Sequence, residues 1–318
     1  MTDESEAVWR RHVIALLATC AMVFIGAELV ARYAVPKISK IESRTTAERA
    51  ASFHIEPLMN GQRTVLVVGN SLMKTGIDLP LLQKEMQPNW RVQRFIVENT
   101  DYYDWYFGLT NLLESGSRPS AIVLMLNTRQ FLAGGVRGPN TAYRLFSAMG
   151  TLRAGMAAGY HPTEISGMLV GHFSAYYGSH QEIRKVLFEH VVPDALPMIE
   201  MMLPERPATD VITSTRIDVE GEPRLVSLRD LCDRFSVKCI FVVPPSMRNS
   251  APQDELVALT AKFGMGGPRF HLGFGANNIA ADGTWPLKFF DTDRFHYSTA
   301  GAAAYTSLLG QALKDALR

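Results

Sequence analysis

Residues capable of covalent acyl chemistry occur in two short stretches of this 318-residue chain. In TVLVVGNSLMKTGID, Ser71 follows a run of apolar residues, and FFDTDRFHYSTAGAAAY contains Asp293 and His296, three residues apart. A serine hydroxyl is a poor nucleophile until an imidazole removes its proton, and the imidazole needs a carboxylate that fixes its tautomer. We therefore predict a catalytic triad of Ser71, His296 and Asp293.

Each of these features also has a simpler explanation when it is taken alone. A serine after a strand is more often a helix cap or turn residue than a nucleophile, and a histidine before a helix can be a surface group. Neither explanation accounts for the coincidence of Ser71 with an Asp-x-x-His pair, so the combination favours catalysis.

The elements that would position these residues alternate between strands and helices. Apolar runs predict strands at 65–68, 91–97, 120–126 and 237–243, and amphipathic patterns predict helices that begin at Asp78, cover 104–114 and cover 300–317. This order is typical of an α/β protein with a mostly parallel sheet covered on both faces. The predicted sheet places Ser71 at the carboxyl end of its first strand, where ligands bind in open α/β sheets.

The interval between the third and fourth predicted strands is too long for one crossover. Stretches 140–160 and 179–192 read as amphipathic helices, so we predict a helical insertion at about 132–205. The insertion emerges beyond the carboxyl end of the third strand. It either walls the site there or is a packing appendage without substrate contact.

An apolar segment at 13–31 contains a single charge, Glu28. It is long enough to cross roughly 30 Å of hydrocarbon, and Trp9 and Tyr33 flank it as interfacial residues do. A cleaved signal peptide is the alternative, but no small-x-small cleavage site stands out before Arg32. The pattern favours an uncleaved transmembrane signal anchor.

These patterns define the expected organisation of the chain. Residues 1–12 form a cytoplasmic N-terminus, 13–31 the anchor, 32–63 a polar tether, and 64–318 the α/β domain with its insertion. We expect a single pass through the inner (cytoplasmic) membrane with the domain outside, in the periplasm, although Arg and Lys residues after the anchor weaken the charge argument for this orientation.

Composition excludes some classes of function and leaves others open. A net charge of +1 gives no reason to expect nucleic acid as a partner. The three cysteines form no metal-binding pattern, and we expect no metal and no cofactor. Cys232 and Cys239 would be buried thiols in a reducing compartment or could form a disulfide in an oxidising one.

Three blocks of the sequence resemble the SGNH (GDSL-type) hydrolase superfamily. Gly69-Asn70-Ser71 matches the family's G-D-S nucleophile motif, Asp293 and His296 match its Asp-x-x-His pair, and HYSTAGAAAY resembles the usual continuation into the last helix. The resemblance covers about 64–130 and 225–318. It implies a flavodoxin-like three-layer sandwich with Ser71, Asp293 and His296 as catalytic residues.

Two blocks depart from the family pattern. The glycine expected after the second strand is absent, with Asn99 or Thr100 nearest, and Arg129 occupies the place of the asparagine expected after the third. The remaining oxyanion donors are the amide of Ser71 together with Asn99, Asn127 and Arg129. Arg129 would stabilise the oxyanion, bind a carboxylate or phosphate of the substrate, or form a structural salt bridge.

The resemblance extends to membrane-anchored proteins of polysaccharide O-acetylation and of teichoic acid D-alanine transfer, which work with membrane-bound O-acyltransferases. It implies an esterase or acyltransferase for O-acetyl groups on cell-envelope polysaccharide or exopolysaccharide, acting through acyl-Ser71, with such an acyltransferase as partner. Two alternatives stay open: a membrane-anchored esterase of small esters or lipids, and a catalytically weak binding or scaffold component of an envelope assembly.

Overall fold

The chain forms an α/β domain around a parallel four-stranded sheet with strand order β2-β1-β3-β4. The computed structural model describes residues 3–57, 61–192, 212–245, 251–265 and 285–318. The strands are β1 (Arg63–Gly69), β2 (Trp90–Ile96), β3 (Ala121–Met125) and β4 (Lys238–Val242). Gly69 lies opposite both Ile96 and Met125. Met125 in turn lies opposite Val242. The predicted α/β architecture with a parallel sheet is thus confirmed, and the four strands end at one level.

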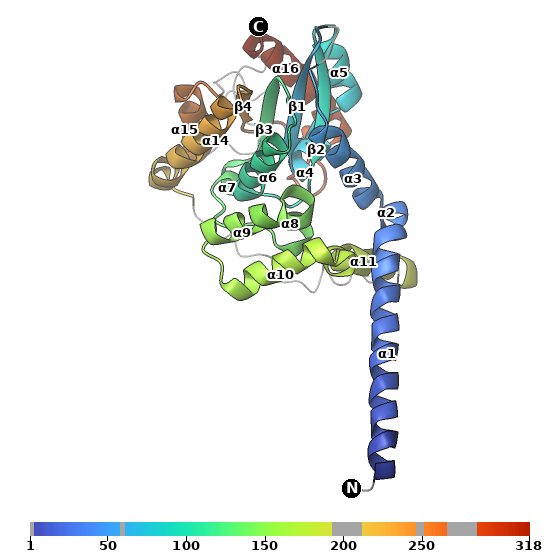
Figure 1. The fold of residues 1–318 in the computed structure, drawn as a ribbon. Coiled ribbons are helices and arrows are strands. Elements are labelled where there is room, and N and C mark those ends of the chain that lie inside the picture. Colours follow the sequence, from blue (N-terminus) through green and yellow to red (C-terminus); the bar gives the residue numbers. More distant parts are fainter. Residues whose placement is uncertain (1–2, 58–60, 193–211, 246–250, 266–284) are drawn as a thin grey trace.

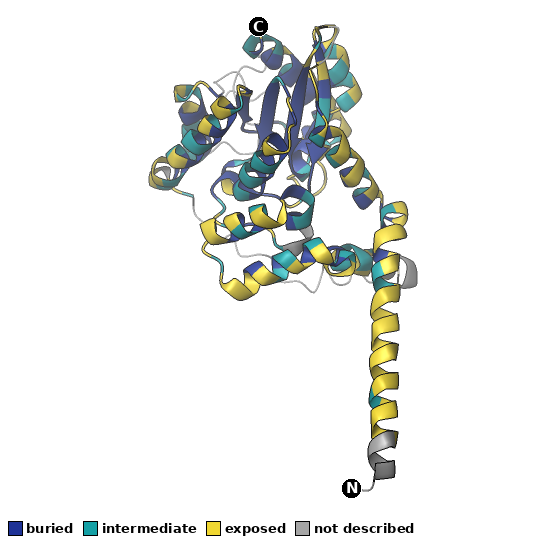
Figure 2. Ribbon diagram, viewed as in Figure 1, coloured by how far each residue is buried: buried dark blue, intermediate teal, exposed yellow. Residues whose placement is uncertain are grey.

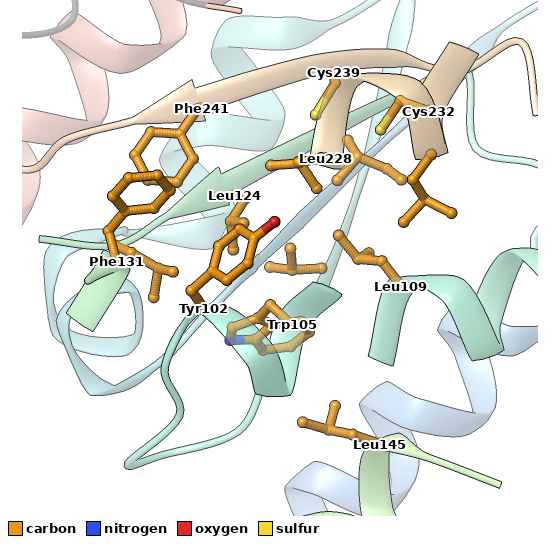
Figure 3. Packing of buried hydrophobic residues seen from close by; sticks show 14 of the residues in the cluster. Tyr102, Trp105, Leu109, Leu124, Phe131, Leu145, Leu228, Cys232, Cys239 and Phe241 are labelled. Atoms are coloured by element: carbon orange, nitrogen blue, oxygen red, sulfur yellow. The ribbon is translucent and has the colours of Figure 1, made fainter. Parts of the chain in front are cut away.

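Helices cover both faces of this sheet (Figure 1). Val65 and Val67 pack on one face, against α4 (Ser71–Gly76), α5 (Leu79–Met86) and α16 (Thr299–Ala316). Leu66 and Val68 point to the other face. That face is covered by α6 (Tyr102–Glu114), α7 (Thr128–Phe131), α14 (Glu222–Arg234) and α15 (Ala251–Lys262). Figure 3 shows its aromatic and aliphatic packing, in which Trp105 and Tyr102 are fully buried. The alternation arises because successive strand side chains point to opposite faces.

The predicted insertion contains helices that pack on the same side of the domain as α6. They are α8 (Pro139–Leu145), α9 (Ala148–Ala157), α10 (Pro162–Phe173) and α11 (Ala175–Val191). The stretch 140–160, expected as one helix, is two, because the hydroxyl of Ser147 caps α9 by accepting a hydrogen bond from the amide of Gly150 at 3.0 Å. The end of the predicted insertion, 193–205, lies outside the described residues.

The N-terminal helix α1 (Asp3–Tyr33) projects from the domain (Figure 1). Among the described residues it is the helix that is long and apolar enough to cross a membrane. Its apolar side chains are exposed along most of its length (Figure 2). An exposed apolar helix of this length agrees with the predicted anchor at 13–31.

The segment 32–63, expected as an aperiodic tether, instead contains α2 (Val35–Ile38) and α3 (Lys40–Phe53). The carboxylate of Glu48 in α3 accepts a hydrogen bond from the backbone amide of Ile96 at 2.9 Å, and Arg44 donates to the Ile96 carbonyl at 3.2 Å. Charged side chains of α3 therefore provide hydrogen-bond partners for backbone groups at the exposed edge of strand β2. A helix that docks through polar groups shows no apolar periodicity, which explains why the pattern did not reveal it.

Cys232 at the end of α14 and Cys239 in β4 are free and buried. Figure 3 shows both sulfur atoms among apolar side chains. The hydrogen bond with Cys232, together with burial, raises the pKa of the Cys239 thiol. Of the two alternatives for this pair, the structure shows buried thiols.

The remaining short elements are α13 (Ser214–Arg216), the π-helix η1 (Ile217–Gly221) and the 3₁₀ helix η3 (Leu287–Phe289).

Candidate active site

Ser71 is the first residue of α4, directly after strand β1. The preceding Asn70 is buried; its Oδ1 accepts from the amide of Leu72 at 3.1 Å and its Nδ2 donates to the carbonyl of Thr100 at 2.9 Å. Asn70 thus caps α4 and ties the end of β1 to the loop after β2. The strand end is tightly packed, because a Cβ on Gly69 would lie 2.8 Å from the carbonyl oxygen of Met125.

His296 and Asp293 lie in the turn before α16 and reach the same strand edge. The Nε2 atom of His296 is 2.9 Å from the Oγ of Ser71, and its Nδ1 is 2.5 Å from the Oδ2 of Asp293. With a proton on Nδ1, the imidazole donates to the carboxylate and its Nε2 accepts from the serine hydroxyl. The structure therefore brings the three predicted residues together in the connectivity that a serine nucleophile requires.

Backbone hydrogen bonds hold this turn in place. The amide of Asp291 donates to the carbonyl of His296 at 2.8 Å, and the amide of Ser298 donates to the carbonyl of Phe289 at 3.0 Å. Ser298 caps α16, and a Cβ on Gly301 would overlap the Phe289 carbonyl oxygen, so the helix start is pressed against the turn. This packing fixes the direction in which His296 points.

The carboxylate of Asp293 is stabilised in its charged form. Its Oδ1 accepts from the backbone amides of Phe295 and His296, each at 2.9 Å. Partial burial acts to raise the pKa of Asp293, but the hydrogen bonds from the His296 side chain and the two amides outweigh it and lower that pKa below its ordinary value. Asp293 is consequently ionised at neutral pH, as orientation of the imidazole requires.

Ser71 and His296 open into a cavity of about 510 Å³. The other residues proposed from the sequence, Asn99, Asn127 and Arg129, line the same cavity, whereas Asp293 contacts His296 outside the cavity lining. Lining residues that the sequence analysis missed include Asp101, Arg137, Tyr160 and Arg216. The first three lie in loops, Arg137 and Tyr160 within the insertion, and Arg216 ends the short helix α13; no motif distinguishes them.

Two backbone amides are candidates for an oxyanion hole. Asn99, near the place of the missing glycine, has a φ of 58°, in the left-handed region that favours glycine. Within the described residues, neither the amide of Asn99 nor that of Ser71 donates a hydrogen bond, and both residues line the cavity. Asn127 has a different role in the structure, because its Oδ1 caps α7 by accepting from the Gln130 amide at 2.9 Å.

The cavity is lined by more positive than negative charge. Arg137 pairs with Asp101 at 2.8 Å, and Arg216 pairs with Glu220 at 2.9 Å. Arg129 is exposed in the cavity; its charge acts to lower the pKa of Asp101, but within the described residues its guanidinium makes no direct hydrogen bond or ion pair. Its guanidinium is therefore available to an anionic ligand.

A buried carboxylate supports the loops around this cavity. Asp104 in α6 accepts from the amide of Asp101 at 2.9 Å and from the amide of Arg137 at 3.1 Å. Burial raises the pKa of Asp104 to about 7, although the two amides act against that rise. Asp104 thereby joins the loop after β2, which contains Asp101, to the loop before α8, which contains Arg137. Asp101 and Arg137 form the ion pair between these loops.

The arrangement combines a hydroxyl nucleophile, an oriented general base and amide donors in one cavity, which is the equipment for acyl transfer. Among the residues that the structure describes, no group of three or more His, Cys, Asp or Glu side chains could hold a metal ion. The chain matches no protein-family model and no curated protein.

Proposed function

We propose that this chain is a membrane-anchored serine acyltransferase or esterase of the SGNH (GDSL-type) class, with a flavodoxin-like three-layer domain. Its substrates are O-acyl groups, O-acetyl above all, on cell-envelope polysaccharide or exopolysaccharide. The observation that carries the proposal is the contact of 2.9 Å between Ser71 Oγ and His296 Nε2, with Asp293 on the opposite ring nitrogen.

The proposed reaction follows from these contacts. His296 takes the hydroxyl proton as Ser71 attacks the acyl carbonyl, and the amides of Ser71 and Asn99 stabilise the oxyanion. The tetrahedral intermediate collapses as His296 gives the proton to the departing alcohol, which leaves an acyl-serine. Water or a sugar hydroxyl, deprotonated by His296, then attacks the acyl-serine, so that hydrolysis and transfer share their first half.

The proposed setting is the inner membrane, crossed once by α1, with the domain in the periplasm. The supporting feature is the exposed apolar helix α1, which would hold the cavity close to a membrane-borne acyl donor. A membrane-bound O-acyltransferase that presents such a donor is the proposed partner.

The direct test is to trap the acyl-enzyme. Full-length protein in detergent micelles is mixed with p-nitrophenyl acetate, quenched with acid and digested, and we expect an acetyl group on the peptide that contains Ser71. Adding oligosaccharide acceptors should accelerate deacylation if the protein is a transferase. A deacylation rate that is the same with and without acceptor indicates an esterase. Folded protein that never acquires the acetyl group would contradict the proposed chemistry and favour a scaffold.

A second prediction concerns Arg129. Because two amides already serve the oxyanion, we expect Arg129 to bind an anionic group on the substrate. The Arg129→Ala variant should turn over neutral p-nitrophenyl acetate at the wild-type rate but lose roughly 10- to 100-fold in kcat/KM on an ester that carries a carboxylate. Arg137→Ala is unsuitable as a control because it breaks the ion pair with Asp101, which lines the cavity. Arg153→Ala is suitable, because Arg153 is outside the cavity lining and its pair with Glu114 at 3.9 Å is exposed. An equal loss on both esters would assign Arg129 to the oxyanion.

A further inference from the structure

The single charge in the apolar segment 13–31 has a structural partner in the insertion. The carboxylate of Glu28 accepts hydrogen bonds from the Ser174 hydroxyl at 2.9 Å and from the amides of Ala175 and Tyr176 at 2.8 and 3.1 Å. Ser174 is the N-cap of α11, so these amides begin a helix and have no partner within it. Glu28 therefore fastens the start of α11 to α1.

Arg32 makes a second attachment one turn further along α1. Its guanidinium pairs with Glu28 at 2.7 Å and donates to the carbonyl of Phe173 at 3.1 Å. The chain from Phe173 to Tyr176 is thus held beside the stretch of α1 between Glu28 and Arg32. Glu28 is three residues before the end of the apolar segment, about 5 Å at the helical rise, so this part of the insertion lies at the depth where hydrocarbon gives way to headgroups.

The side chains at this depth suit a membrane boundary. Phe173 is 74% exposed, and Val170, Tyr176 and Tyr177 are also exposed. Aromatic rings concentrate at the interface of bilayers because one part of the ring system is apolar and another is polar. In Figure 1, α10 and α11 lie at the end of the domain from which α1 projects.

We propose that residues 170–177, the corner between α10 and α11, rest on the bilayer that α1 crosses, with the Phe173 ring among the lipid acyl chains. The argument uses the membrane helix and does not depend on acyl chemistry at Ser71. The partner of this surface is lipid, because Glu28 and Arg32 hold the corner beside the end of the apolar segment of α1, at the boundary of the bilayer.

The helix α10 also connects this corner to the candidate active site. The opposite end of α10 follows Tyr160, which lines the cavity and whose hydroxyl donates to the carbonyl of Val136 at 2.7 Å. The twelve residues of α10 span about 18 Å. Figure 1 shows α10 running across the direction of α1, so this helix connects one side of the cavity to the membrane corner along the bilayer surface.

Lipid quenching of a fluorescent label tests this contact in the full chain. Native Cys20 lies exposed on α1 and supplies the reference position within the bilayer. Phe173→Cys and, as control, Gln311→Cys in α16 are made in a Cys20→Ala background, labelled with a nitrobenzoxadiazole maleimide and reconstituted into phosphatidylcholine nanodiscs. Buried Cys232 and Cys239 are checked for background labelling in the Cys20→Ala protein.

We expect lipids with a doxyl group on the acyl chain to quench the label at position 173 nearly as strongly as the label on Cys20, and to leave the label at position 311 unquenched. Adding Glu28→Ala should reduce quenching at position 173, because α11 is then no longer fastened to α1. A label at position 173 that is quenched only by aqueous iodide overturns the proposal. If the label on Cys20 is quenched in the same nanodiscs, that outcome leaves the membrane helix and the proposed function intact. If the label on Cys20 is unquenched as well, the proposal that α1 crosses the membrane is also rejected.

Discussion

Replacing Ser71 with alanine is expected to abolish labelling by a serine-directed fluorophosphonate and to reduce acyl transfer by a factor on the order of 10⁴ or more. The covalent step needs an oxygen nucleophile, and the Ser71 side chain is the group that contacts the base. The hydroxyl makes no other hydrogen bond in the described part of the chain, so the variant should fold normally and melt close to the wild-type temperature.

Ser166→Ala is a matched control for this measurement. Ser166 lies in the first half of α10 and is exposed, whereas Ser71 is half-buried; the Ser166 hydroxyl donates to the Thr163 carbonyl, outside the cavity lining. The Ser166→Ala protein should be labelled as wild type is. Full labelling of the Ser71→Ala protein would show that the nucleophile lies elsewhere and would remove the proposed mechanism.

The Asp293→Asn variant is expected to lose activity by about 10⁴-fold while keeping its fold. The amide oxygen of asparagine can still accept from the backbone amides of Phe295 and His296, so the turn is preserved. Its NH₂ group, however, would face Nδ1 of His296, which can then bond only as an acceptor. The imidazole proton moves to Nε2, and the ring can no longer take the proton of Ser71.

Asp291→Asn in the same turn supplies the control. Asp291 Oδ1 accepts from the amide of Thr292 at 2.8 Å and does not contact the imidazole. The measurement is kcat/KM for p-nitrophenyl acetate, with thermal melting to confirm folding. Equal losses in the two variants would mean that the effect comes from the turn and not from the tautomer of His296.

The sheet was predictable from the sequence because its strands are buried on both faces. Their apolar residues are consecutive, as in Val65–Val68, and the helix start at Asp78 carries its own cap, with Oδ1 accepting from the Leu81 amide. The helix α3 was not predicted, and α10 was covered only by the general prediction of a helical insertion at about 132–205, because polar contacts or neighbouring helices fix these two helices. In α3, Glu48 accepts a hydrogen bond from the backbone amide of Ile96 at the edge of strand β2, and such a polar contact leaves no apolar repeat in the sequence.

The triad was also predictable, because its three members occur in two recognisable stretches of sequence. The lining of the cavity was not. Arg137 and Arg216 come from a loop and from the segment before α14, and only the folded chain brings them to Ser71. Asn99 illustrates the limit most clearly, since asparagine tolerates a left-handed backbone but the loop that it occupies decides whether it takes one.

The separation of 225 residues between Ser71 and His296 has a consequence for synthesis of the protein. The ribosome makes the serine long before it makes the histidine, so an incomplete chain carries an inert alcohol. In the proposed mechanism, Ser71 becomes reactive only when α16 packs against α4 and α5 and brings His296 to it. If the proposed activity is present, the order of translation acts as a safeguard, because a fragment without the carboxyl-terminal residues contains Ser71 but not the base that would activate it.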